Sequence, residues 1–160
     1  MKYPMKKTAL FKIWGIIIPL MAISCKEDLP PVIQEPPVSH SDMLICHHTI
    51  VWDSITTRNA LIGKWQWEYI TCYGNPEEAN YDDYKDMFVE FKADNTLEVK
   101  MNEQITQTVT WDLKSGEANV WIMKVEPLVP QIVGRIILCG DRVEFQDSYT
   151  DGCDNYFKRK

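Results

Sequence analysis

The stretch LIGKWQWEYITC, Leu61–Cys72, decides the fold class of this chain. Its residues alternate, because every second position from 63 to 69 is glycine or aromatic and the positions between carry Lys, Gln and Glu. A period-two pattern with aromatic side chains on one face is typical of a half-buried β-strand. The apolar face consists of Gly63, Trp65, Trp67 and Tyr69.

Further strand-like runs follow this stretch, and short turn signals such as Asp94-Asn95, Ser115-Gly116 and Gly140-Asp141 separate them. Short strands at even spacing predict a sandwich or a barrel. The links are all of hairpin length, which favours closure, because a closed barrel removes exposed strand edges. We therefore expect an all-β domain over 61–160, an eight-stranded antiparallel up-and-down barrel. The runs after the first are 85–92, 97–101, 105–111, 121–125, 132–139, 143–145 and 153–160.

The first 24 residues have the composition of a secretory signal peptide. Four lysines precede an apolar run over 13–23, which is shorter than the about 20 apolar residues of a transmembrane helix. The run ends at Ala22-Ile23-Ser24-Cys25, which resembles a bacterial lipobox, in which the Cys is diacylated and becomes the mature N-terminus. We expect a lipid anchor on Cys25, and an ordinary secretory signal with an incidental Cys is the alternative.

Residues 25–41 are predicted to be a tether between this anchor and the folded domain. Two Pro-Pro pairs favour extended polyproline II. Lys26-Glu27-Asp28 resembles the short tags that send many Bacteroidetes lipoproteins to the outer face of the outer membrane. We therefore expect an outer-membrane lipoprotein, and the sequence leaves open whether the domain faces the periplasm or the cell exterior.

The mature chain is acidic. All 23 Asp and Glu follow residue 24, whereas 4 of the 17 Lys and Arg precede it, so the net charge falls from −6 to −10. An acidic domain does not suggest binding to nucleic acid or to anionic lipid. The membrane, reached through the lipid anchor, is the expected partner, and the sequence names no protein partner.

Residues 42–60 separate the tether from the first strand. They are apolar enough to pack, and Asp42, Asp53 and Ser54 are suitable caps for short helical turns. We expect an irregular or partly helical capping segment that lies across one end of the barrel.

A family resemblance rests on the two ends of the barrel. Gly63-Lys64-Trp65 matches the Gly-x-Trp that begins the lipocalin barrel, and the chain ends in Tyr156-Phe157-Lys158-Arg159, where lipocalins place an Arg that packs on that Trp. Residues 61–160 thus resemble the short lipocalin-like domains of Bacteroidetes lipoproteins. The resemblance implies that Gly63, Trp65 and Arg159 close the barrel, with the Arg over the indole as a cation–π contact.

Four cysteines besides Cys25 predict two disulfides in an exported protein. In an up-and-down barrel the first and last strands are neighbours, so Cys72 and Cys153 meet at one end. Cys139 ends the sixth strand at the other end, near Cys46 in the capping segment. A Cys139–Cys153 bridge would have to span the seventh strand, roughly 20 Å, which exceeds disulfide reach.

No sequence pattern indicates catalysis, a metal or a cofactor. Cys46-His47-His48 has ligand residue types but lacks a second group at metal spacing, so a disulfide Cys beside two imidazoles is the simpler interpretation. The acidic residues of the loops fit no EF-hand pattern, and a solvated rim explains them. No Gly-x-Ser-x-Gly, phosphate-binding or dinucleotide motif is present.

The inward face of the barrel is the predicted ligand site. An eight-stranded barrel is either just filled by side chains or holds one small ligand. We expect a non-catalytic lipoprotein that binds or carries a small hydrophobic or amphipathic molecule, with a mouth near the loop 73–84. A filled barrel that acts as a surface interaction or inhibitory module is the alternative. The predicted pocket consists of Trp67, Tyr69, Met101, Trp111, Trp121 and Met123.

Overall fold

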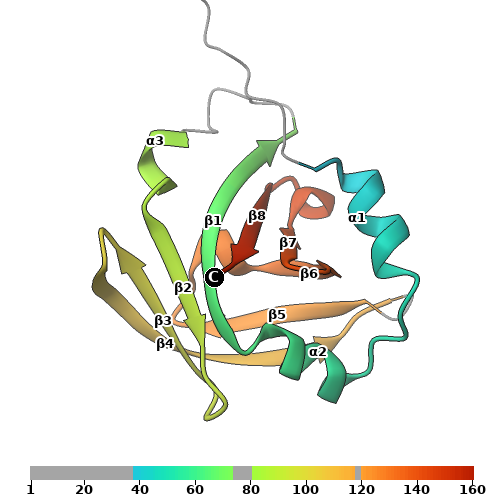
Figure 1. Ribbon diagram of the computed structural model, residues 1–160, viewed down its shortest axis with the longest axis horizontal. Helices are drawn as coiled ribbons and strands as arrows, with labels where there is room; N and C mark the ends of the chain where they lie inside the picture. Colours follow the sequence, from blue (N-terminus) through green and yellow to red (C-terminus); the bar gives the residue numbers. More distant parts are fainter. Residues whose placement is uncertain (1–37, 74–80, 118–119) are drawn as a thin grey trace, which may run out of the picture. The chain divides into compact units, whose positions relative to one another are not determined.

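The computed structural model describes residues 38–73, 81–117 and 120–160. The predicted signal peptide, Cys25 and nearly all of the predicted tether lie outside these residues. Eight antiparallel strands follow one another around a closed barrel, each paired with its neighbours in the sequence and β1 with β8 (Figure 1). The predicted up-and-down barrel is confirmed. The strands are β1 (Gly63–Cys72), β2 (Met87–Phe91), β3 (Thr96–Met101), β4 (Gln104–Ser115), β5 (Trp121–Glu126), β6 (Gly134–Cys139), β7 (Arg142–Gln146) and β8 (Cys153–Arg159).

The capping segment is more regular than the sequence predicts. It forms two eight-residue helices, α1 (His40–His47) and α2 (Ser54–Leu61). Asp53 caps α2 by accepting from the Thr56 amide, as expected, whereas α1 is capped by Ser39 and not by Asp42. Within the described residues, no helix has the length and apolar character needed to cross a membrane.

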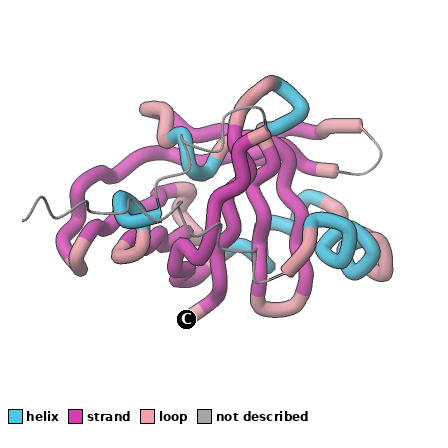
Figure 2. Tube along the Cα trace, turned by 90° about the horizontal axis from the view of Figure 1, so that it is seen from above, coloured by secondary structure: helices cyan, strands magenta, loops and turns pink. Residues whose placement is uncertain are grey.

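Short helical turns occupy the links between strands. They are α3 (Tyr81–Tyr84), η2 (Pro130–Ile132) and η3 (Ser148–Thr150). Because η2 takes up Pro130–Ile132, β6 begins at Gly134 and not at the predicted Ile132. Figure 2 shows the strand wall from above, with helical segments outside it on the right.

The prediction that Tyr69 faces the interior is wrong, because β1 contains a bulge. Trp67 pairs with Phe157 and Tyr69 with Tyr156, so Glu68 is the extra residue. An inserted residue reverses the alternation beyond it. Ile70 therefore joins the interior core, whereas Tyr69 packs outside the barrel in a separate cluster, with its ring centroid 6.1 Å from that of Tyr156.

Arg159 joins the two ends of the barrel sequence. Its guanidinium lies 4.2 Å from the ring centroid of Trp65, as the family resemblance implies, and donates to the carbonyls of Ile62 (3.0 Å) and Ala60. Gly63 has φ 127°, and a Cβ there would lie 2.9 Å from the Arg159 Nη1. The glycine of the Gly-x-Trp motif is thus required both by backbone conformation and by the close approach of Arg159.

The two disulfides are the predicted ones. Cys72–Cys153 joins the directly paired ends of β1 and β8, and Cys46–Cys139 joins α1 to the end of β6. The first bridge therefore reinforces the closure between the first and last strands. The second fixes the capping segment to the barrel.

The two helices cover different surfaces. α2 leads directly into β1, and its Leu61 is fully buried in the barrel core, so it closes one end as predicted. α1 instead packs against the outside of the wall near β6, where Met43 contacts a second cluster with Ile137 and Tyr156 (Figure 1). The expectation that the whole segment lies across one end is wrong for α1.

A hydrogen-bonded His–Glu pair lies under α1. Glu144 points outward from β7, yet its side chain is 0% exposed, and its Oε1 lies 2.7 Å from the His40 Nδ1 at the start of α1. Burial is the main reason why the pKa of Glu144 is raised above its ordinary value. The helix thus covers a titratable group as well as apolar side chains.

Replacing both Cys72 and Cys153 by Ala is expected to lower the free energy of unfolding by about 2–4 kcal/mol, because the bridge restricts the unfolded chain over a sequence separation of 81 residues. Denaturant unfolding of the mature chain measures the loss. Reduction of the double variant then removes only the Cys46–Cys139 bridge. An unchanged unfolding midpoint in the double variant would contradict the expectation.

Replacing Arg159 by Leu is expected to destabilise the protein by about 2–4 kcal/mol, because two carbonyls lose their charged donor and Trp65 loses its cation–π partner. Arg159→Lys keeps the charge without the planar guanidinium, so its stability should lie between those of the wild type and Arg159→Leu. The neighbouring Lys158, whose side chain is 43% exposed, provides the control Lys158→Leu, expected within about 0.5 kcal/mol of wild type.

Candidate binding site

The predicted pocket residues do not surround one chamber. Trp67, Trp111 and Met123 belong to the interior core, with exposed fractions of 2%, 1% and 3%. Met101 and Trp121 only border that core, and they lie toward opposite ends of the barrel, since β3 ends at Met101 and β5 begins at Trp121. Tyr69 lies outside, as described above.

Aromatic rings fill the barrel interior. Phe91 contacts Trp111 edge-on at 5.1 Å between ring centroids and lies 6.2 Å from Phe145, which in turn contacts Phe157 at 5.6 Å. These four residues come from β2, β4, β7 and β8, so the column of rings crosses the barrel. A side chain that borders an empty chamber keeps part of its surface free of neighbours, whereas these four are each 1% exposed or less.

The core extends upward from this column toward the end where β1 finishes. The Trp67 indole donates to the Asn155 Oδ1 at 3.0 Å, and its ring lies 5.6 Å from that of Tyr84. Val129 and Ile132, from the link between β5 and β6, are 3% and 0% exposed in the same core. The strand pattern of the sequence does not identify Asn155, because a polar residue in a strand gives no sign that it faces inward.

The described residues do form a hollow beside β4 and β5. Exposed side chains such as Asp112 and Lys124 border it, and so do the core residues Trp111 and Met123. It has a volume of about 760 Å³ and is open to solvent. We call it the outer groove. This volume falls within the range of about 300–1,000 Å³ that is usual for ligand pockets. Its residues are Asp94 and Asn95 of the β2–β3 turn, Thr110–Asp112 of β4, Met123–Glu126 of β5, and Leu128 and Val133 of the β5–β6 link.

Arg58 of α2 organises one side of the outer groove. Its guanidinium lies 4.5 Å from the Trp111 ring centroid, donates to the Asp112 Oδ1 at 2.6 Å and donates to the Asn95 side chain. The helix that closes the barrel therefore also fixes the position of the β2–β3 turn against β4. No sequence pattern joins these residues, because they lie up to 54 positions apart.

The outer groove is both apolar and acidic. Leu128 is 67% exposed at its border. Three carboxylates, from Asp94, Asp112 and Glu126, line it together with the Lys124 ammonium. The Arg58 guanidinium neutralises Asp112, which leaves an excess of one negative charge. Hydrogen bonds from the hydroxyl and amide of Thr96 hold the pKa of Asp94 below its ordinary value, so this carboxylate stays charged. The groove thus suits a ligand with an apolar part and a positive charge.

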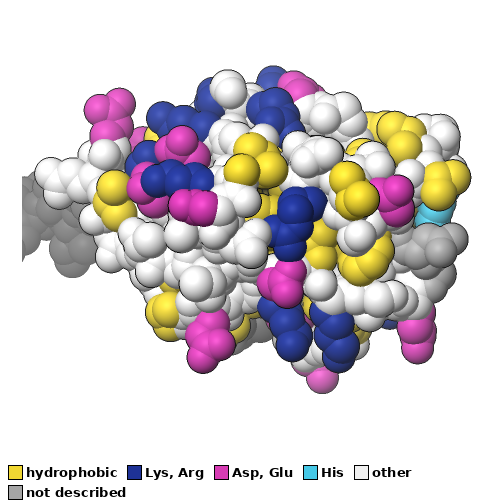
Figure 3. All heavy atoms as spheres, turned by 90° about the horizontal axis from the view of Figure 1, so that it is seen from below, with side chains coloured by type: hydrophobic (Ala, Val, Ile, Leu, Met, Phe, Trp, Pro, Cys, Tyr) yellow, Lys and Arg dark blue, Asp and Glu magenta, His cyan; other side chains and the backbone are white. Residues whose placement is uncertain are grey.

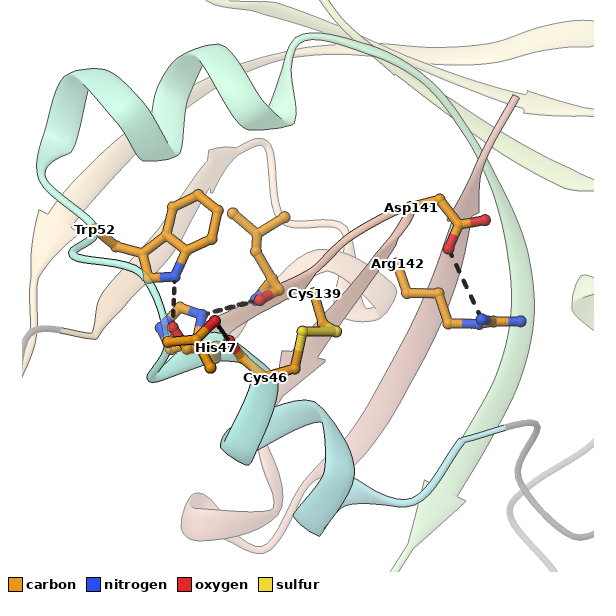
Figure 4. Close-up of a disulfide and its surroundings, with 8 residues drawn as sticks. Cys46, His47, Trp52, Cys139, Asp141 and Arg142 are labelled. Atoms are coloured by element: carbon orange, nitrogen blue, oxygen red, sulfur yellow. Dashed lines mark hydrogen bonds and ion pairs between the residues drawn. A yellow bond between two sulfur atoms is a disulfide. The ribbon is translucent and has the colours of Figure 1, made fainter.

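Cys46 and His47 have structural roles (Figure 4), whereas His48 is exposed. His47 is 3% exposed, stacks on Trp52 with ring centroids 5.4 Å apart, and its Nδ1 lies 3.0 Å from the Leu138 amide, which donates to it. Burial lowers the pKa of His47 more than the nearby Leu138 carbonyl raises it. The imidazole therefore packs as a neutral acceptor.

The acidic residues near β8 are also structural in part. Asp154 is 1% exposed and accepts from the amides of Asp147 and Ser148, so it organises the β7–β8 link and is not part of a solvated rim. Glu77 and Glu78 lie outside the described residues. Among the described residues, no three His, Cys, Asp or Glu side chains gather as a metal site would require.

Replacing His47 by Asn should flatten the pH dependence of stability. Because folding lowers its pKa below 6.5, His47 contributes stability above about pH 6.5 and loses it as the pH falls through the folded-state value. Asn keeps an acceptor for the Leu138 amide without titrating. Thermal unfolding between pH 7.5 and 5 measures the change in Tm. His48→Asn, at an exposed position, should retain the wild-type slope; equal slopes in all three proteins would refute the assignment.

Comparison with known proteins gives one match. The family model described as a lipocalin-like domain matches residues 61–133, from the end of α2 to the residue before β6. Neither the curated proteins nor the solved structures yielded a match. The matched residues contain Gly63 and Trp65 but not Arg159. A lipocalin-like barrel is typically a binding or carrier fold and not a catalytic one.

Proposed function

Because the chain carries a lipocalin-like domain, we propose that it is a non-catalytic binding protein, lipid-anchored at the outer membrane through Cys25, that recognises its ligand in the outer groove. The single observation that supports this choice is the aromatic column from Trp111 to Phe157, which occupies the space where a carrier would hold its ligand. Because the interior is filled, we expect the ligand to bind at the surface of the barrel. This agrees with the alternative of a filled barrel that acts as an interaction module.

The ligand proposed for the outer groove combines an apolar group with a cationic group. The exposed Leu128 offers apolar contact at the border. Asp94 and Glu126 offer negative charge, whereas Asp112 is already paired with Arg58. Charge complementarity of this kind gives specificity against anionic molecules such as fatty acids more than it gives raw affinity.

The anchor is supported by the sequence alone. The lysine-rich start, the apolar run over 13–23 and the cysteine at its end have the order of a lipoprotein signal. Acyl chains hold a protein firmly, because each buried CH₂ contributes about 0.8 kcal/mol. The proposed protein therefore presents its outer groove in the space next to the membrane, where it meets ligands without a catalytic step.

Two amphiphiles of equal chain length and opposite charge test this function. Titrated below micelle formation into the isotope-labelled mature chain, decylamine should shift the amide signals of 94–95, 110–112 and 123–128 saturably, and decanoate should not. Glu126→Lys should raise the Kd for decylamine about tenfold, equivalent to about 1.4 kcal/mol. The matched reversal Lys124→Glu should lower the Kd.

The opposite result would assign the carrier function. Saturable shifts around Trp67 and Met87 on addition of decanoate would mean that the interior opens to admit a fatty acid. Shifts by decylamine that are insensitive to both charge reversals would show that the groove does not select by charge, and the proposed ligand class would be wrong.

A further inference from the structure

The capping segment exposes an apolar surface that the fold itself does not use. Ile45, Ile50, Val51 and Ile55 are 68%, 50%, 87% and 69% exposed. Ile45 lies in α1, Ile50 and Val51 lie in the link 48–53, and Ile55 lies in α2. We call them the capping-segment patch. On the side where α1 and α2 lie in Figure 1, Figure 3 shows hydrophobic side chains gathered at the surface beside a histidine. Such concentrations of exposed apolar side chains mark interaction sites.

The patch is held in place by its buried neighbours. Cys46 is bonded to Cys139 of β6, and the Trp52 indole donates to the His47 carbonyl at 2.9 Å. The Trp121 indole donates to the Trp52 carbonyl at 3.0 Å, which ties the α1–α2 link to β5. The exposed side chains are therefore presented by a fixed backbone.

Charge around the patch distinguishes between kinds of partner. Residues 38–57 contain no Lys or Arg, and the carboxylates of Asp42 and Asp53 lie on the same segment. Arg58, which follows in α2, is paired with Asp112 at the outer groove. The outer wall of β2 and β3 differs, since it carries ion pairs such as Lys100–Glu90 at 2.7 Å. The patch thus lacks the cations that attract anionic lipid or nucleic acid, and it suits a surface that is apolar below a neutral polar layer.

The position of the patch in the chain indicates what that surface is. Only 13 positions separate Cys25 from Val38, where the described chain begins, and α1 follows directly. A fully extended chain of that length spans at most about 45 Å. A lipid on Cys25 would thus hold the capping segment within this distance of the bilayer, at a local concentration high enough for a weak contact to be populated.

We propose that the capping-segment patch inserts into the neutral headgroup region of the bilayer that anchors Cys25. This proposal rests on the lipid anchor of the proposed function. The aliphatic side chains enter the boundary between headgroups and acyl chains, and the contact restricts the orientation of the barrel against the membrane. Because no cation takes part, the contact depends little on salt.

Amide hydrogen exchange tests the proposal on the lipidated mature chain in vesicles of phosphatidylcholine and phosphatidylethanolamine. The amides of 48–55 should exchange several-fold more slowly than in the non-lipidated chain mixed with the same vesicles. The double variant Ile50→Asp/Val51→Asp should remove this protection. Ile105→Asp is the matched control, because Ile105 is also exposed, at 56%, but lies on β4, and it should keep the protection.

Two results would overturn the proposal. One is equal exchange of 48–55 with and without vesicles. The other is protection that grows with protein concentration in the absence of vesicles and disappears in the double variant, since the patch would then join two copies of the chain. Either result leaves the outer groove and its amphiphile titration unaffected.

An artificial attachment to the vesicles tests the insertion of the patch independently of the lipid on Cys25. The mass of the mature N-terminal peptide reports whether Cys25 carries lipid. A mature chain with an N-terminal polyhistidine tag, bound to the same vesicles with nickel-chelating lipid added, should show the same protection of 48–55 whether or not Cys25 is modified in cells. An unmodified Cys25 would thus refute the proposed lipid anchor. Absence of protection on the nickel vesicles would refute the insertion of the capping-segment patch.

Discussion

The closure of the barrel depends on Arg159. One guanidinium lies over the Trp65 ring and donates to the carbonyls of Ala60 and Ile62 at the end of α2. The first strand, the last strand and the helix that closes the end thereby share one charged group. Position 63 requires glycine, because its φ is positive and a Cβ there would lie 2.9 Å from the Arg159 Nη1. β1 and β8 are thereby held as neighbours, which closes the barrel.

Local sequence patterns made most of the barrel topology predictable. Turn signals and period-two patterns determine the number of strands, and hairpin links determine their order, so the disulfide pairs Cys46–Cys139 and Cys72–Cys153 could be derived from topology. The bulge at Glu68 could not, because WQWEY reads as unbroken alternation. The bulge depends on how β1 and β8 fit together over their length, and that information is spread across two distant strands.

The candidate site shows a different limit of sequence reasoning. Periodicity says which side chains face inward, and Trp67, Trp111 and Met123 do. It does not say whether inward side chains leave space, since that depends on the summed volume of rings from four strands. The outer groove was not predictable either, because Arg58 and Asp112 meet across 54 positions and two elements. Its acidic and apolar residues look ordinary in their own strands.

The capping segment joins the N-terminal part of the chain to the barrel. The Cys46–Cys139 bridge, the His47–Leu138 hydrogen bond and the His40–Glu144 pair fix α1 to the outer wall at separate points. Displacing α1 would expose Met43 and Tyr156 and would remove His40 from the buried Glu144 side chain. The chain that leads back to Cys25 thus joins a rigid part of the fold. With the proposed lipid anchor, a tether joined to a rigid part can restrict the orientation of the whole barrel, whereas one joined to a loose end would only limit its distance from the membrane.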